Sequence, residues 1–403
     1  MKFSEMNTDQ MAKVLVTIAE PVASIAKDEK ESLFNIRRWA DGKTYWPSRY
    51  GFYDFSNLKA WMYRKDIFDQ HGLEIPSTYD ELYDVAKRLK DLYPDSYPIS
   101  CENFFSYIAQ SAGPQWKKNF QCWEYYDFTA GKWCFGAAED TMLDIVKVFK
   151  RFYDDELIQP NFTASTEHEF RELVTGGRTF IFPHNQSRMG DFITEASIIN
   201  RAFDLAVMAP PVADASGGKP LMINSRSDSG GMSIVNTGDK IRISNAVKLF
   251  DWFYSAQAYE LLSWGEEGQT YEISTGTKRF ILSRDEDIRS KYGFQTPAAA
   301  QAVYPEAVMS EQFKYNTSED VKTLLSSIES DYNPRNWISF TEDEQEILSE
   351  TGAAIRSFAR ENISKFLIGQ KPLSEWDSFV EDLYDMDLDE LLSVYETAYD
   401  RVK

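Results

Sequence analysis

The sequence is poor in the two residue types that most often build metal sites and covalent crosslinks. Its 403 residues include three histidines and three cysteines, which leaves little room for a His-rich metal centre, a zinc knuckle or a disulfide framework. Cys101, Cys122 and Cys134 lack metal-ligand spacing. We therefore expect free, partly buried thiols, with a single disulfide as the alternative. The sequence predicts no metal site and no cofactor.

Positive charge and long apolar runs are also scarce. The 43 Lys and Arg residues stand against 64 Asp and Glu, a formal net charge of −21, and a surface that acidic repels nucleic acid and anionic lipid. No stretch approaches the roughly 18 to 20 apolar residues of a transmembrane helix. The run from Val14 to Ile25 is broken by Glu20 and Pro21, so we expect no signal peptide in this chain, which as written would stay in the cytosol.

Specific catalytic motifs are missing as well. The sequence has no G-x-S-x-G elbow, no phosphate loop ending in G-K-S/T and no G-x-G-x-x-G after a strand. We expect His71 to close a helix and His168 to lie in an acidic, exposed segment. A pair of carboxylates could serve a glycoside hydrolase, but 64 acidic residues single out no pair. Catalysis is therefore only the alternative reading.

Helix-like and strand-like segments alternate along the chain, and this pattern favours an α/β architecture. At about 150 residues per domain, the length predicts two substantial lobes. Ligands of such proteins lie at strand ends or in the cleft between lobes. We expect capping boxes at Thr78–Glu81 and Thr341–Glu344. The predicted strands cover 60–63, 178–182, 203–208 and 232–235. The first capping box opens a helix that carries Leu82 to Leu92 on one face. A helical turn is expected at 65–70, and further helices are expected at 141–153, 244–262, 341–369, 376–383 and 388–402.

Aromatic residues are the most abundant informative class, with 27 Phe, 22 Tyr and 10 Trp. Sugar rings pack their C–H faces on Trp and Tyr, while their hydroxyls need planar polar partners. Loop position and the mixing of aromatic with polar residues select Trp116, Trp123, His184, Asn185, Arg188, Trp264, Arg335 and Trp337 as candidate ligand contacts. Any one of these Trp residues is more often a packing residue, and His184 is equally well explained as structural.

Several short motifs in order resemble one family. They begin with Asp41-Gly42-Lys43-Thr44-Tyr45 and Met62-Tyr63-Arg64-Lys65-Asp66, and continue with Gly265-Glu266-Glu267-Gly268 and Leu373-Ser374-Glu375-Trp376. This combination resembles family 1 extracellular solute-binding proteins, the receptors of ATP-binding-cassette (ABC) importers, and above all their sugar-associated lipoprotein subgroup. The resemblance covers nearly the whole chain.

The resemblance implies a two-lobed, periplasmic-binding-protein-like α/β fold of the class II type, with a hinge between discontinuous lobes and a helical C-terminal end. The N-lobe is expected over residues 1–98 and 236–320, incomplete at its start. The C-lobe is expected over 99–235 and 321–403. Relatives begin with a signal peptide, a lipid-modified Cys and a first strand-helix-strand unit, so we expect a longer precursor.

The implied function is the capture of a carbohydrate, an oligosaccharide, in the interlobe cleft and its delivery to membrane permease subunits. The resemblance adds Trp46, Arg49 and Tyr50 as cleft-facing residues, and it implies a monomeric, membrane-anchored lipoprotein outside the cytoplasm without catalytic activity. The segment Pro94-Asp95-Ser96-Tyr97-Pro98 is too short for the calcium loop of some relatives. The alternatives are a secreted polysaccharide-degrading enzyme, that is a glycoside hydrolase, and a noncatalytic surface adhesin.

Overall fold

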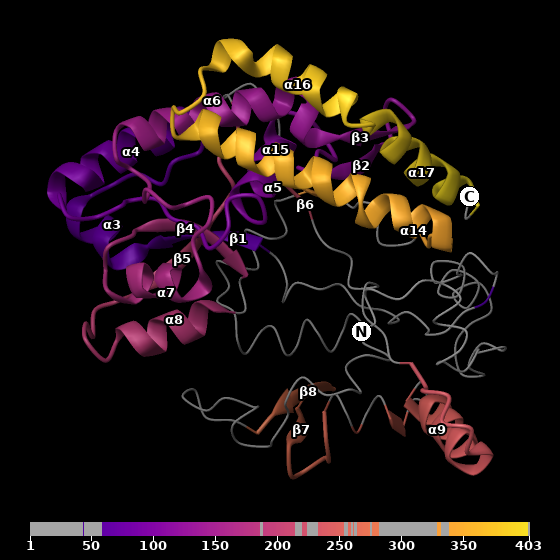
Figure 1. The fold of residues 1–403 in the computed structure, drawn as a ribbon. Helices are drawn as coiled ribbons and strands as arrows, with labels where there is room; N and C mark the ends of the chain where they lie inside the picture. The colour runs from indigo at the N-terminus through magenta and orange to yellow at the C-terminus, as the bar shows by residue number, and fades with distance from the viewer. Residues whose placement is uncertain are drawn as a thin grey trace.

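A three-stranded sheet organises the largest body of the structure (Figure 1). The structure is a computed structural model that describes residues 43, 59–185, 188–213, 220–223, 233–253, 257–258, 261, 264–274, 276–281, 329–331 and 338–401. The sheet contains β1 (Lys59–Arg64), β4 (Ile181–Asn185) and β5 (Leu205–Met208) in the order β4-β1-β5. Both neighbours run antiparallel to β1.

The sequence of β1 explains why both faces of this sheet are covered. Successive side chains of a strand point to opposite faces. Trp61 and Tyr63 accordingly belong to one hydrophobic core, whereas Ala60 and Met62 belong to a second. Each face of the sheet therefore needs its own layer of helices.

Two pairs of helices supply these layers (Figure 1). On the Trp61 side lie α3 (Lys65–His71) and α4 (Tyr79–Leu92), and on the Met62 side lie α7 (Glu167–Thr175) and α8 (Met189–Ala196). The predicted capping box at Thr78 and Glu81 opens α4 and is confirmed. Gly72 ends α3 in the left-handed conformation that glycine adopts without strain, with φ of 60°.

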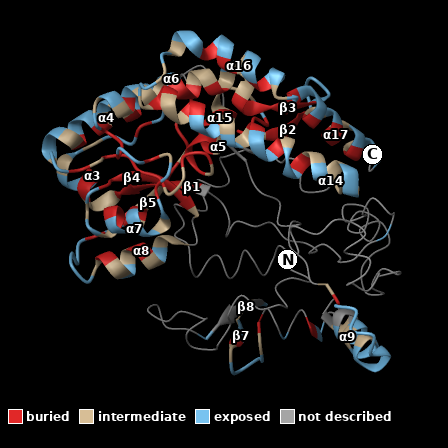
Figure 2. Cartoon of the chain, viewed as in Figure 1, coloured by how far each residue is buried: buried red, intermediate tan, exposed pale blue. Residues whose placement is uncertain are grey.

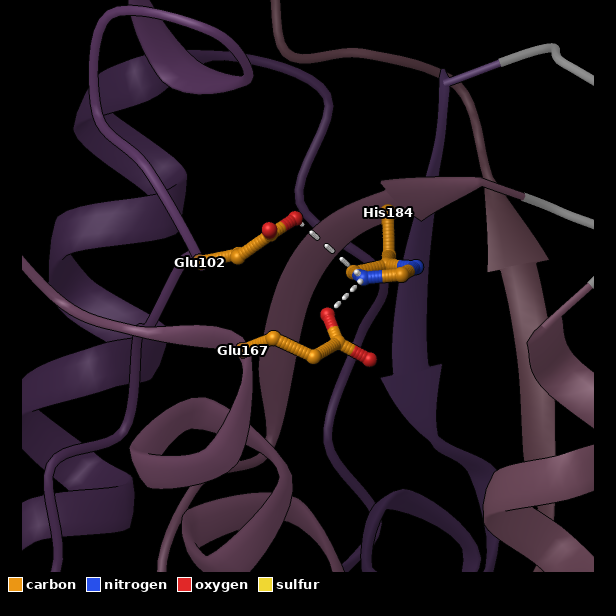
Figure 3. Close-up of side chains that lie close together, drawn as sticks. All are labelled: Glu102, Glu167 and His184. Carbon is orange, nitrogen blue, oxygen red and sulfur yellow. Dashed lines mark hydrogen bonds and ion pairs between the residues drawn. The ribbon is translucent and has the colours of Figure 1, made fainter.

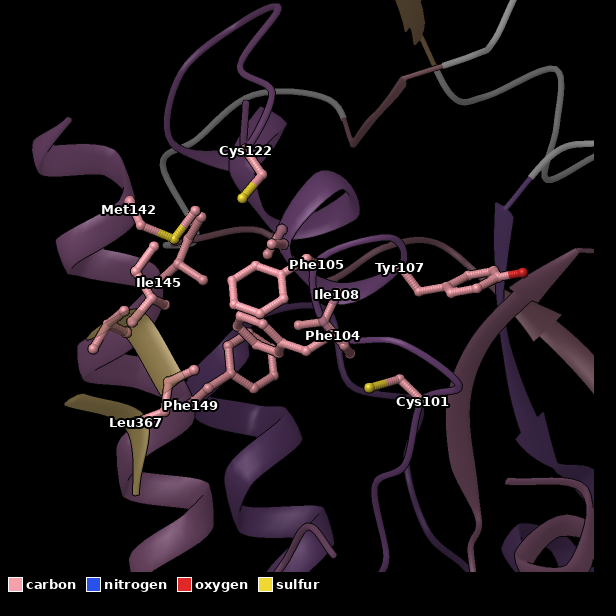
Figure 4. Packing of buried hydrophobic residues seen from close by; sticks show 14 of the residues in the cluster. Cys101, Phe104, Phe105, Tyr107, Ile108, Cys122, Met142, Ile145, Phe149 and Leu367 are labelled. Carbon is pink, nitrogen blue, oxygen red and sulfur yellow. The ribbon is translucent and has the colours of Figure 1, made fainter. Parts of the chain in front are cut away.

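The larger core extends beyond the sheet into a helical layer (Figure 2). Phe104, Phe105 and Phe149 are among its fully buried side chains (Figure 4). From the middle of the chain, the core is lined by α5 (Ile108–Ala112), by the hairpin of β2 (Glu124–Asp127) and β3 (Lys132–Phe135), and by α6 (Asp140–Asp154). From the C-terminal part, it is lined by α14 (Glu342–Ser349), α15 (Thr351–Leu367), α16 (Trp376–Asp385) and α17 (Leu388–Asp400). Short 3₁₀ turns lie at Gly113–Gln115, Gly136–Ala138 and Leu373–Glu375. The predicted helical C-terminal end is thus confirmed.

The remaining described elements are smaller. Strand β6 (Leu221–Ile223) pairs in parallel with β9 (Glu329–Asp331). The hairpin of β7 (Tyr271–Ser274) and β8 (Thr277–Phe280), together with α9 (Lys240–Phe253), lies apart from the main body in Figure 1. Among the described residues, no helix is both long and apolar enough to cross a membrane.

Four predicted elements differ from the structure. The strand expected at 178–182 is β4 at 181–185. The long helix expected from residue 341 breaks at Glu350, between α14 and α15. The helix expected at 244–262 begins earlier, at Lys240. A strand was also expected at 232–235, but its described residues, 233–235, belong to none of the strands β1 to β9. The three cysteines are free, as expected, and all are buried.

The expected lobe boundary between residues 98 and 99 falls between strands of one sheet. Strand β1 precedes that boundary, yet both of its partner strands follow it. The helix α4, also from the expected N-lobe, shares one core with α6 and α15 from the expected C-lobe. The described chain from residue 59 to residue 213 therefore forms one body, and it does not change core at residue 98.

Candidate functional site

His184, one of the predicted site residues, lies near the carboxyl end of the edge strand β4. Strand pairing places it opposite Ala60 of β1. Phe182, two residues earlier, points to the same face and is buried against α7 and α8. The backbone of β4 therefore carries the imidazole into the space between the sheet, α7 and the segment that leads into α5.

Three aromatic rings hold this imidazole. The rings of Tyr107 and Phe170 lie nearly parallel to it, each with a centroid distance of 5.2 Å and with interplanar angles of 12° and 4°. The ring of Phe192 meets it edge-on, also at 5.2 Å. Tyr107 points away from the packed phenylalanines of the main core (Figure 4). The side chain of His184 is only 3% exposed, so its orientation is fixed by packing.

Two carboxylates face the Nε2 atom of the imidazole (Figure 3). Oε2 of Glu167 lies 3.4 Å from it, and Oε2 of Glu102 lies 3.7 Å from it. Glu167 is the first residue of α7, whose start is fixed by a capping box between Thr166 and Glu169. Ligand atoms of the three residues all lie within 4.8 Å of one another.

The second oxygen of Glu167 is held by arginines. Its Oε1 lies 3.6 Å from Nη2 of Arg188 and 3.9 Å from Nη1 of Arg171. Arg188 also pairs with Asp191 at 2.8 Å, and Arg171 pairs with Glu195 of α8. These contacts leave Oε2 of Glu167 turned toward His184.

Burial dominates the electrostatics of this cluster, which comprises Glu102, Glu167 and His184. Burial lowers the pKa of His184, although Glu167 and Glu102 oppose the shift, so burial favours the neutral imidazole. Burial and then the charge of Glu102 raise the pKa of the Tyr107 hydroxyl. A neutral imidazole beside two carboxylates can accept hydrogen bonds from hydroxyl groups or ligate a cation.

Of the other predicted site residues, Arg188 and Asn185 lie next to the cluster. Arg188 contacts Glu167. Asn185 follows His184 at the end of β4, where it pairs with Lys59, and it is half-buried. The structure thus brings three of the predicted residues to one place.

The described tryptophans of the prediction pack against protein groups. Trp116 is half-buried and stacks on Tyr79 with a centroid distance of 5.0 Å. Trp123 is half-buried against Phe105, and the guanidinium of Arg360 lies over its ring at 5.5 Å. Trp264 is 2% exposed and packs on Tyr271, so stacking on a ligand would require this segment to open. Trp46, Arg49, Tyr50, Arg335 and Trp337 lie outside the described residues.

The other two histidines behave as expected. His71 is the last residue of α3, and its Nε2 lies 2.8 Å from the hydroxyl of Tyr93. The side chain of His168 is 82% exposed. A separate pocket of about 230 Å³ lies beside the start of α9 and is lined by Ser233, Ile234, Val235, Thr237, Arg242, Ile243 and Ala246. It shares no residue with the cluster around His184.

The sequence prediction missed Glu102, Tyr107 and Glu167. Glu167 lies 17 residues before His184, and Glu102 lies much farther from it along the chain. Chain spacing therefore gives no sign that they meet. One available signal was the segment from Thr166 to Val174, which has a capping box followed by apolar residues at helical spacing and places Glu167 at a helix start.

Comparison with known proteins gives the family. The sequence profile described as "Bacterial extracellular solute-binding protein" matches residues 8–260. The polygalacturonan/rhamnogalacturonan-binding protein YtcQ of Bacillus subtilis (strain 168) is 21% identical over 356 residues, which are 84% of this chain and 67% of that protein.

Solved structures give the fold. The S. pneumoniae ABC-transporter substrate binding protein FusA, in complex with kestose, is similar with a TM-score of 0.70 at 15% identity, over 97% of this chain and 84% of that one. The alginate-binding protein AlgQ2, without calcium ion, is similar with a TM-score of 0.68 at 17% identity, over 96% of this chain and 82% of that one. These similarities confirm the predicted two-lobed, periplasmic-binding-protein-like α/β fold.

The family profile spans more than half of the chain, and it includes the segments that carry Glu102, Glu167 and His184. The described helices and strands agree with the fold of the solved structures. The profile and the solved structures belong to binding proteins and not to enzymes. The chain therefore belongs to the family of bacterial extracellular solute-binding proteins.

Proposed function

We propose that this protein is the receptor subunit of an ABC importer and that it captures an oligosaccharide. The observation that carries the proposal is the match of the solute-binding family over residues 8–260. Proteins named for polygalacturonan and alginate binding, and one in complex with kestose, are among its relatives and structural neighbours. The ligand class is therefore a saccharide of several units.

The receptor acts outside the cytoplasm, where its extracellular family functions. We propose that it is a monomer, anchored to the membrane as a lipoprotein in its precursor form, and that it hands its ligand to permease subunits. A closed form stabilised by bound sugar is the form that the permease recognises. Binding proceeds without making or breaking a bond in the ligand.

The sheet and the cores support an assignment of the lobes. We propose that residues 59–213 and 338–401 form one lobe, because α14 to α17 share the larger core with the sheet and with α3 to α6, while the smaller core lies on the other face of the same sheet. α9 and the β7–β8 hairpin belong to the other lobe, since they lie apart from this body. On this assignment, no crossing between the lobes falls at residue 98.

The proposed ligand contacts come from two groups of residues. Trp46, Tyr50 and Trp337 would stack on sugar rings, while Arg49 and Arg335 would donate hydrogen bonds to hydroxyls. Asn185 and Arg188 would join them at the carboxyl end of β4, where the polar cluster is open to solvent through Glu167, whose side chain is 42% exposed.

A binding screen tests the function. Thermal unfolding is followed with kestose, oligogalacturonates, alginate oligosaccharides and non-sugar solutes, and the same wells are analysed for hydrolysis products by mass spectrometry. A true ligand at 100 times its dissociation constant should raise the free energy of unfolding by about 2.7 kcal/mol. Stabilisation by a non-sugar solute alone would overturn the oligosaccharide assignment, and released products would favour a glycoside hydrolase.

Variants then test the site. Trp46→Ala and Trp337→Ala should each weaken sugar binding at least tenfold, as measured by calorimetry. Tyr384→Ala is the matched control, because this aromatic side chain is 48% exposed on α16 and has no proposed ligand role. If both Trp variants bind sugar as tightly as the control does, the stacking assignment is wrong.

A further inference from the structure

The distances around His184 are unusual for a simple hydrogen-bonded histidine. A good N–H···O bond joins atoms about 2.7–3.2 Å apart, whereas Nε2 lies 3.4 Å from Glu167 and 3.7 Å from Glu102. Two acceptors face one nitrogen, and neither is at optimal distance. The imidazole cannot turn away, because it is stacked between Tyr107 and Phe170.

The same distances suit a shared metal ion. With Zn–N and Zn–O bonds of about 2.0–2.2 Å and tetrahedral angles, neighbouring ligand atoms lie about 3.3–3.5 Å apart. The Nε2 to Glu167 distance of 3.4 Å falls in this range. Glu102 lies slightly beyond it, and its side chain is 28% exposed. Its oxygen would therefore have to move by roughly 0.3 Å toward the imidazole to complete the site.

We propose that Glu102, Glu167 and His184 form a binding site for one divalent transition-metal ion, with Zn²⁺ as the best fit. One imidazole nitrogen with two carboxylate oxygens is a set that zinc accepts, whereas calcium takes six to eight oxygens. Three protein ligands leave a fourth position open. The sequence predicted no metal site because His and Cys are scarce, and that argument does not cover one His joined by two carboxylates.

The surroundings of the site orient its ligands. Arg188 and Arg171 lie against Oε1 of Glu167 and leave Oε2 for the metal. Such outer partners fix ligand geometry in metal sites. Arg188 also pairs with Asp191 at 2.8 Å. The guanidinium therefore keeps a carboxylate partner when Glu167 binds the metal. The open fourth position takes a water or an oxygen of the solute, and only this last role rests on the proposed function.

The test measures Zn²⁺ binding alone, without sugar. The purified full chain is treated with chelator and titrated with Zn²⁺ by calorimetry, and Co²⁺ is used as a spectroscopic probe. We expect one tight site and a cobalt spectrum of four-coordinate intensity. An excess of Ca²⁺ should not displace the metal. The absence of Zn²⁺ binding by the folded wild-type chain would overturn the proposal and leave the oligosaccharide receptor untouched.

Isosteric variants locate the site. Glu102→Gln and Glu167→Gln should each weaken Zn²⁺ binding at least tenfold. Mutating a residue that only contacts a metal ligand already lowers metal affinity by about 10–100-fold, so the loss of a ligand should lower it at least as much. Both side chains are partly exposed, and circular dichroism checks that the variants fold. The control is His168→Gln, since His168 lies 3.7 Å from Glu172 on the surface of α7 and is the rival site. Loss of binding in the control, or unchanged binding in both Glu variants, would overturn the assignment.

Discussion

The imidazole of His184 lies parallel to the ring of Phe170, with 5.2 Å between the centroids and 4° between the planes. Phe170 comes from α7 and His184 from β4. The helix that supplies Glu167 therefore also supplies one wall of the slot that holds the imidazole. Packing of α7 on the sheet and the geometry of the proposed metal site are coupled through this one ring.

The first prediction concerns this coupling. Phe170→Leu should lower the free energy of unfolding by roughly 1–3 kcal/mol through lost packing, and it should also weaken Zn²⁺ binding because His184 can then rotate. Phe366→Leu is the control, since Phe366 is equally buried but pairs with Trp376 on α16. Urea unfolding and zinc titration are measured for both. Equal zinc affinities would show that the ring plays no part in orienting His184.

The second prediction concerns the pair that ties α15 to β2. Glu124 is fully buried, and Nη1 of Arg356 donates a hydrogen bond to its Oε1. Arg356→Met leaves a buried carboxylate without this cation, which should cost about 3–5 kcal/mol of unfolding free energy. The double variant with Glu124→Gln should recover much of that loss.

Urea unfolding of the two single variants and the double variant gives the coupling energy. Arg360→Met is the matched control, one turn further along α15. It is exposed and lies over the rings of Phe105 and Trp123, so its loss should cost at most about 1 kcal/mol. Similar costs for the two arginines would contradict the buried-pair interpretation.

Local sequence signals predicted the elements well where the interacting residues are close along the chain. Both expected capping boxes form, at Thr78–Glu81 and Thr341–Glu344. The strand expected at 178–182 ends before Pro183, a residue type that central strands exclude. The structure resolves this, since β4 is an edge strand and tolerates a proline there.

Contacts between residues far apart along the chain could not be predicted from such local signals. The partners of β1 lie more than a hundred residues later, and no local pattern indicates that Trp61 and Phe104 share a core. For the same reason no local pattern indicates that β1 pairs with strands on the far side of residue 98. His184, Asn185 and Arg188 could be selected because they follow the strand predicted at 178–182, whereas Glu102 was one of 64 acidic residues without a distinguishing neighbour.

The third prediction concerns pH. Burial tends to raise the pKa of Glu344, but hydrogen bonds from Arg401 and from Thr341 outweigh this and hold that pKa below its ordinary value. A carboxyl with a lowered folded-state pKa adds stability above its unfolded pKa, and this stability is lost as the pH falls through the folded pKa. The contribution of Glu344 should therefore be complete at pH 7 and vanish in acid.

Glu344→Gln keeps an acceptor for the capping box and removes the charge. It should lower the unfolding free energy by about 0.5–1 kcal/mol at pH 7, and the difference from wild type should shrink toward pH 3. Glu342→Gln is the control, because Glu342 is an exposed residue of the same first turn. Thermal unfolding at several pH values measures both. A difference that grows in acid would contradict the assigned direction.

The fourth prediction concerns a close approach of two backbones. A Cβ atom on Gly136 would lie 1.8 Å from the carbonyl oxygen of Gln121 and 3.0 Å from the ring of Phe120. The amide of Gly136 donates to the carbonyl of Trp123 at 3.1 Å, which fixes the two segments against each other. Because a backbone oxygen cannot rotate away as a side chain can, Gly136→Ala should lower the free energy of unfolding by about 3 kcal/mol.

Gly190 supplies the matched control for this substitution. It lies in α8, and nothing stands within 4 Å of the position of its missing Cβ. Gly190→Ala should stabilise the protein by up to about 1 kcal/mol, because alanine favours the helix over glycine. The two variants should thus move the urea midpoint in opposite directions. A neutral Gly136→Ala would mean that the β3 end and the segment around Gln121 lie farther apart than the structure places them.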